Sequence, residues 1–197
     1  MVITKTRDRL VDVARQLFAR DGVENTTMND IAVASKRGRR TLYTYFKSKE
    51  DIYMAVAKSE LEILADKMMR VSQRNISPEE KLLQIIYTRL ETIKEVVYRN
   101  GTLRADFFRD IWRVEVIRKK FDAKEILLFR SVLAEGKAKG FFDIDDVNLT
   151  ATIVHYCVKG IEVPFIRGQI GPPSLPIEVR RQYVKNLVLR ALGKGTV

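Results

Sequence analysis

The densest group of side chains that could bind another molecule is "KRGRRTLYTYFKSKE", from Lys36 to Glu50. Five lysines and arginines fall between Lys36 and Lys47, with two tyrosines among them. Ammonium and guanidinium groups bind phosphate oxygens, and arginine also fits the paired acceptors of a guanine. The stretch therefore predicts contact with a polyanion, and a solvated basic turn is the alternative.

The positive charge of the chain is concentrated at the same end. The net charge is +11, and residues 1–49 hold eleven Lys and Arg against five Asp and Glu, which gives +6 of that total. A local positive balance favours the phosphate backbone of nucleic acid or an anionic membrane surface as partner. Charge alone leaves both partners open.

Four helices are expected to position the basic stretch. Apolar residues at helical spacing predict a first helix from Arg7 to Arg20. Thr27 and Asp30 predict a capping box that opens a second, short helix ending near Ser35. A third is expected from Arg39 to Phe46, and Ser48 with Asp51 repeats the capping box to open a fourth.

Two short helices joined by a turn are typical of a helix-turn-helix, whose second helix enters the DNA major groove. At 100° per residue, Leu42 and Phe46 point to one side of this helix and Arg40 and Thr44 to the other. The apolar pair must face inward. The sequence thus predicts Arg40 and Thr44 toward the bases.

The other contacts follow from residue type and position. Arg39 lies at the start of the helix, where side chains reach base edges, and Thr41 and Tyr43 flank the reading face. Tyr45 lies nearer the buried side, so that its hydroxyl could meet a phosphate. Thr27 and Lys49 stand at helix N-termini, where free N–H groups already attract anions.

"TTMNDIA" followed by "TLYTYFKSKEDIY" resembles the DNA-binding segment of TetR-family transcriptional regulators, over about Arg7 to Tyr53. The resemblance implies an all-helical homodimer whose first three helices bind DNA. The remainder would bind a small molecule and form the dimer, and most such proteins are repressors released by that ligand. It also implies DNA contacts from Thr27, Arg39, Arg40, Thr41, Tyr43, Thr44, Tyr45 and Lys49.

The turn departs from the family pattern, since "SKRGRRTLY" stands where "AGVSKGTLY" is usual. Lys36 replaces the turn glycine and is expected to adopt a left-handed backbone conformation at some energetic cost. Gly38 replaces the capping serine. Arg40 replaces a small glycine, so it either reads a base or holds the helix slightly out of the groove.

The rest of the chain is also expected to be helical. Further helices are predicted from Pro78 to about Tyr98, through Phe107 to Trp112, and over 114–139, 146–166 and 177–191. The expected fold class is all-α with about nine helices. We expect a DNA-binding domain over residues 1–50 and a helical ligand-binding and dimerisation domain over 51–197, linked by a helix from about 49 to 72.

The candidate ligand-binding residues lie in this second part. They are Tyr87, Arg104, Phe108, Trp112, His155, Tyr156 and Glu162, and each of the aromatic residues could equally be plain core. His155 and Cys157 are two residues apart and so lie on different helix faces, which predicts no metal site. The last two helices are expected to form a homodimer.

These residues bear on three classes of function. We predict a ligand-responsive DNA-binding regulator that acts as a repressor, needs no cofactor and has DNA, a small-molecule effector and a second copy as partners. A peripheral membrane or scaffold protein is the alternative, but no exposed aromatic face stands beside the charges. An enzyme is disfavoured because no glycine-rich phosphate loop or metal-ligand cluster is present in the sequence. The single cysteine and the absence of a membrane span or signal sequence predict a cytoplasmic protein.

Overall fold

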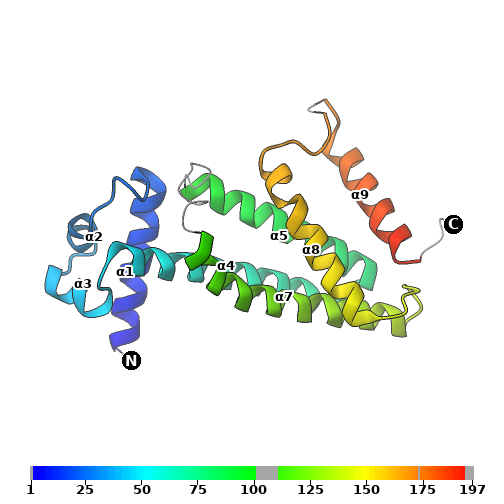
Figure 1. Ribbon diagram of the computed structural model, residues 1–197, viewed down its shortest axis with the longest axis horizontal. Helices are drawn as coiled ribbons and strands as arrows, with labels where there is room; N and C mark the ends of the chain where they lie inside the picture. The colour runs from blue at the N-terminus through cyan, green and yellow to red at the C-terminus, as the bar shows by residue number, and fades with distance from the viewer. Residues whose placement is uncertain (1, 101–110, 173, 194–197) are drawn as a thin grey trace. The chain divides into compact units, whose positions relative to one another are not determined.

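The computed structural model describes residues 2–100, 111–172 and 174–193, and this part of the chain is entirely helical. Its eight helices are α1 (Val2–Asp21), α2 (Met28–Ala34), α3 (Arg39–Tyr45), α4 (Lys49–Ser72), α5 (Pro78–Asn100), α7 (Ile111–Ala138), α8 (Val147–Ile166) and α9 (Ile177–Ala191) (Figure 1). The expected all-α class is therefore confirmed. The short helix expected around Phe107 falls outside the described residues.

The chain folds into two compact units that do not follow a single cut in the sequence. Unit 1 comprises residues 1–63 and 95–119, and unit 2 comprises residues 64–94 and 120–197. The helices α4, α5 and α7 each supply residues to both units. Each unit has its own buried residues.

Unit 1 is built on the first four helices. Leu10, Ala14, Leu17 and Phe18 are buried along one stripe of α1, as their helical spacing predicts. They pack in one apolar cluster with Ile31 of α2, Leu42 of α3 and Ile52 of α4. The inward side of α3 is thereby fixed, since Leu42 has no exposed surface and Phe46 is almost fully buried.

The predicted capping groups fix where the short helices begin. The hydroxyl of Thr27 accepts from the backbone N–H of Asp30 at 3.2 Å, and the Asp30 carboxylate accepts from the Thr27 N–H at 2.9 Å. This capping box is confirmed. Before α4, Ser48 accepts from the N–H of Asp51, but the Asp51 carboxylate accepts from Lys47 rather than from Ser48. Pro78 opens α5, as expected.

Unit 2 has an apolar core and an ion pair that joins α5 to α7. Leu82 and Ile85 of α5 and Phe129 and Leu133 of α7 are fully buried. Glu135 of α7 accepts hydrogen bonds from two lysines, Lys81 of α5 at 2.8 Å and Lys139, which follows the last residue of α7, at 2.7 Å. These hydrogen bonds, that from Lys139 first, lower the pKa of the Glu135 carboxyl below its ordinary value.

Within the described residues, α8 alone is long and apolar enough to cross a membrane by length and composition. The expected absence of a membrane span rested on another criterion, a run of about 18 apolar residues, which α8 does not form because Lys159 and Glu162 interrupt it. Charged and polar residues nevertheless lie along the helix, and His155 and Glu162 are buried inside unit 2.

Candidate DNA-binding surface

The recognition face predicted on α3 is exposed to solvent. Arg40, Tyr43 and Thr44 are exposed, while Leu42 between them is buried. Thr41 and Tyr45 are partly buried, and Tyr45 packs against the apolar cluster of unit 1. Arg39 is exposed as well, so the helix presents four of its predicted contact residues outward and holds its other side in the core.

The turn before α3 takes the strained conformation expected from its sequence. Lys36 has φ = 55°, and it is the one non-glycine residue with positive φ in the described part of the chain. This left-handed conformation costs a residue with a Cβ about 1–2 kcal/mol. Gly38 is the N-cap of α3 with φ = −64° and makes no side-chain capping bond, because it has no side chain.

Two predicted readers are held by bonds within unit 1. The Nε–H of Arg39 donates to Oδ1 of Asn29 on α2 at 2.9 Å, which links the two short helices. The hydroxyl of Thr44 donates to the carbonyl oxygen of Arg40 one turn earlier at 2.9 Å. This bond uses the hydroxyl hydrogen of Thr44, so its methyl group is the part suited to a thymine methyl.

The two predicted phosphate contacts at helix N-termini are also engaged. The Thr27 hydroxyl donates to Oδ2 of Asp30 at 2.6 Å, and this bond lowers the pKa of the Asp30 carboxyl. The ammonium of Lys49 donates to the carbonyl oxygens of Val23 at 2.8 Å and Glu24 at 3.3 Å. Phosphate binding by either residue stays a prediction, and in this structure both brace the loop between α1 and α2.

Other cations border α3 without a carboxylate partner. Lys36, Arg37, Arg40 and Lys47 are exposed, and none has an ion pair among the described residues. Of these, Lys36, Arg37 and Lys47 were not among the predicted site residues. The signal was available, because all three belong to the basic stretch that carries the excess charge.

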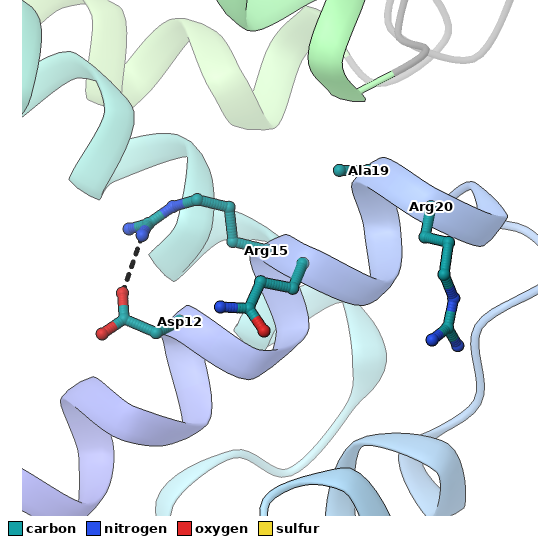
Figure 2. A pocket seen from close by; sticks show the side chains of 5 residues that line it. Asp12, Arg15, Ala19 and Arg20 are labelled. Carbon is teal, nitrogen blue, oxygen red and sulfur yellow. Dashed lines mark hydrogen bonds and ion pairs between the residues drawn. The ribbon is translucent and has the colours of Figure 1, made fainter.

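By contrast, two cations of the long helix α1, Arg15 and Arg20, are paired with carboxylates. An open hollow of about 780 Å³ is lined by Asp12, Arg15, Gln16, Ala19 and Arg20 (Figure 2). Arg15 binds Asp12 at 2.7 Å, as Figure 2 shows, and also Ser59 and Glu60 of α4. Arg20 pairs with Asp21, which raises the pKa of the arginine. The hollow therefore lacks an unpaired charge to hold a ligand.

The candidate ligand residues that the structure describes lie at separate places in unit 2. The Tyr87 hydroxyl on α5 donates to the carbonyl of Arg181 on α9, and burial raises the pKa of this tyrosine. His155 and Glu162 are buried, whereas Tyr156 between them on α8 is exposed. Arg104 and Phe108 fall outside the described residues, as does the side chain of Trp112.

His155 and Glu162 belong to a buried polar cluster that the sequence pattern did not reveal. Arg89 of α5 is almost fully buried and binds Glu125 of α7 and Glu162 of α8. Nδ1 of His155 lies 3.1 Å from Oε2 of Glu125. The signal for Arg89 was its place among buried apolar residues of α5, where a charge must have partners. Its partners are more than thirty residues away.

The outer sides of α8 and α9 carry exposed apolar residues. On α8, Leu149, Ile153 and Tyr156 are more than half exposed and follow one another at helical spacing. On α9, Tyr183 and Leu187 are 70% and 71% exposed, and no residue of this helix is buried. Contiguous exposed apolar side chains of this kind mark contact surfaces.

Comparison with known proteins agrees with this geometry. The family model described as "Bacterial regulatory proteins, tetR family" matches residues 10–56, which contain α2 and α3. The HTH-type transcriptional repressor KstR2 of Mycolicibacterium smegmatis is 32% identical over 184 residues, covering 90% of this chain and 86% of that protein. The HTH-type transcriptional regulator QacR of Staphylococcus aureus is 25% identical over 158 residues, covering 79% and 83%.

Solved structures show the same fold. A transcriptional regulator from Cytophaga hutchinsonii superposes with a TM-score of 0.71 at 21% sequence identity, over 93% of each chain. The similar proteins are regulators of transcription, which favours that function over the membrane or scaffold alternative. The chain belongs to the TetR family of bacterial transcriptional regulators and is a ligand-responsive, DNA-binding regulator.

Proposed function

We propose that this regulator is a cytoplasmic repressor that reads its operator with α3. The observation that carries the proposal is the exposed face of Arg40, Tyr43 and Thr44 opposite the buried Leu42. An arginine on such a face can bind O6 and N7 of a guanine, and Thr44 and Tyr43 can pack on thymine methyl groups. Arg39, Thr41 and Tyr45 contribute at the edges of this face.

Phosphate contacts come from the cations around α3. Lys36, Arg37 and Lys47 are exposed and have no ion pair among the residues that the structure describes, so their charges are available to a DNA backbone. The Lys49 ammonium has one N–H left after its two carbonyl contacts and Thr27 lies at the start of α2. These two residues are proposed as weaker backbone contacts.

A homodimer formed through α8 and α9 presents two copies of α3 to one operator. The exposed apolar residues of these helices are what such an interface would bury. Two half-sites about one DNA turn apart would then be bound together, which multiplies a modest single-site affinity. A small-molecule effector that binds unit 2 with different affinity in the two states would release the DNA. Tyr87, Tyr156, His155 and Glu162 remain candidates for its contacts.

Selection of duplexes from a random pool by the purified full chain tests this proposal. The expected result is enrichment of an inverted repeat whose half-sites are centred about one helical turn apart, with affinity that falls steeply as salt rises. Binding of all duplexes with equal affinity, or of anionic vesicles in preference to DNA, would contradict it. A matched selection with Arg40→Ala shows whether α3 makes the base contacts.

A further inference from the structure

The buried polar cluster of unit 2 contains the elements of a metal site. Asp122 and Glu125 lie one turn apart on α7, and His155 of α8 faces both. One ligand atom from each of the three residues lies within 4.8 Å of the others. The sequence comparison of His155 with Cys157 could not find this arrangement, because the partners of the histidine lie on another helix.

The contacts of His155 leave one ring nitrogen available. Nδ1 lies 3.1 Å from Oε2 of Glu125, and a carboxylate only accepts hydrogen bonds, so Nδ1 carries the proton. In the neutral imidazole Nε2 then holds a lone pair. Nε2 is buried, has no hydrogen-bond partner, and lies 3.8 Å from Oδ1 of Asp122, too far for a hydrogen bond. A fully buried nitrogen without a partner is costly.

This geometry resembles the carboxylate–histidine–metal arrangement of protein metal sites. In such sites one ring nitrogen donates to a carboxylate, which orients the ring, and the other binds the metal. Here Glu125 orients His155, and Arg89 in turn holds the other oxygen of Glu125. Nitrogen and carboxylate ligands bind a metal at about 2.0–2.2 Å. His155 Nε2 and Asp122 Oδ1 therefore need to move little to bind one ion together.

In this structure Lys159 is the cation that binds Asp122. Its ammonium lies 2.7 Å from Oδ2 of Asp122, and its side chain is 29% exposed. A long lysine side chain at the edge of a cluster can turn its charged end into solvent. Asp122 is 15% exposed and the other members are buried, so Lys159 is the most exposed of the described members and can leave without breaking the core.

The charge balance fits this exchange. Among the described side chains of the cluster, the carboxylates of Asp122, Glu125 and Glu162 face the permanent cations Arg89 and Lys159. One negative charge is therefore left when the imidazole is neutral. If Lys159 turns outward and a divalent ion takes its place, these described charges sum to zero.

We propose that unit 2 binds one divalent transition-metal ion through His155 Nε2 and Asp122, with Glu125 positioning the imidazole and Lys159 competing for the site. Imidazole with carboxylate and water is a ligand set suited to Zn²⁺, Ni²⁺ or Mn²⁺. The proposal is independent of the proposed operator contacts, because all of its residues belong to unit 2.

The test is a calorimetric titration with Zn²⁺. The full chain is used, without a histidine tag and after removal of bound metal with a chelator. We expect one ion per chain. His155→Gln and Asp122→Asn should each weaken binding by at least tenfold, whereas Lys159→Met should strengthen it about tenfold because a competing cation is lost. A gain in affinity cannot arise from misfolding. Cys157→Ser is the matched control, since this exposed thiol is the alternative ligand on α8, and it should leave the affinity unchanged.

A spectroscopic readout is direct because the chain has a single histidine. In ¹⁵N NMR spectra of the imidazole, Zn²⁺ should shift the Nε2 resonance and leave Nδ1 protonated. The proposal would be overturned if the unmodified chain bound no Zn²⁺, if His155→Gln and Asp122→Asn both kept its affinity, or if Cys157→Ser lost binding. If Lys159→Met bound Zn²⁺ no more tightly than the unmodified chain, Lys159 would not compete with the ion for the site.

Discussion

The ammonium of Lys49 lies 2.8 Å from the carbonyl oxygen of Val23 and joins the first residue of α4 to the loop before α2. The two residues are 26 positions apart in the sequence. Lys49 therefore positions the helix-turn-helix, whether or not it also touches DNA.

Lys49→Met separates these two roles. The contacts with Val23 and Glu24 would be lost, so the free energy of unfolding should fall by about 1–2 kcal/mol, and the melting temperature should fall with it. If Lys49 only braces the loop, the slope of log affinity against log salt should stay unchanged. A slope reduced by about one unit would show that Lys49 also neutralises a phosphate.

Arg40→Ala should alter the operator that is selected. Loss of a bidentate contact with guanine is expected to cost about 1–3 kcal/mol at one base-pair position and to relax the preference there. Arg70→Ala, which removes the same charge from an exposed position of α4, is the control and should not change the preference. Tighter binding by Arg40→Ala would instead mean that Arg40 holds the helix out of the groove.

The unusual turn residues should limit the stability of the DNA-binding unit. Lys36→Gly relieves the left-handed strain at φ = 55° and is expected to raise the free energy of unfolding by about 0.5–1 kcal/mol.

Gly38→Ser should give a gain of similar size, because a Cβ there meets nothing within 4 Å and serine can cap α3. Gly22→Ser is the matched control. Its φ of +84° strains a side chain, so this variant should be less stable. Denaturant unfolding of the three variants measures these effects, and a loss of stability in Gly38→Ser would refute the capping argument.

The lysine pair around Glu135 predicts a stability that depends on pH. The pKa of this carboxyl is lowered in the folded chain by Lys139 and Lys81, so the ionised form favours folding. This stabilisation is complete above the ordinary carboxyl pKa of about 4.5 and is lost as the pH falls through the lowered value. Glu135→Gln should be less stable than the unmodified chain at pH 7, and the difference should vanish at acid pH. A constant difference from pH 7 to pH 2 in chemical unfolding would contradict this assignment.

The exposed apolar residues of α8 and α9 predict that a single carboxylate placed among them disrupts the proposed homodimer. Ile153→Glu and Leu187→Glu place a carboxylate on side chains that are 52% and 71% exposed in the single chain. Light scattering should then give the mass of one chain, 22.8 kDa, and operator affinity should fall. Gln182→Glu at an exposed polar position of α9 is the control. If both apolar variants keep twice this mass, the interface lies elsewhere.

Local patterns were sufficient to predict most of the fold. The capping box of Thr27 and Asp30 and the first turn at Pro78 depend on residues within three positions, so they could be read from the sequence. The left-handed Lys36 was predicted from the resemblance to the TetR family, in which a glycine is usual at this position. The inward side of α3 followed from the spacing of Leu42 and Phe46, and both are buried.

Tertiary contacts were beyond these patterns. The bond of Lys49 to Val23 and that of His155 to Glu125 join residues 26 and 30 positions apart, and no short motif encodes them. The place of Arg89 among apolar residues of α5 indicates a buried charge, but it does not indicate which residues are its partners. For this reason the ligand candidates in unit 2 were chosen by residue type, and the partners Asp122, Glu125 and Arg89 were not among them.

The interleaved course of the chain has a consequence for attempts to isolate the DNA-binding part. Unit 1 includes residues 95–119 as well as residues 1–63, so no fragment made by one truncation contains all of unit 1 without unit 2 residues. Footprinting or structural work with operator DNA therefore calls for the full-length chain.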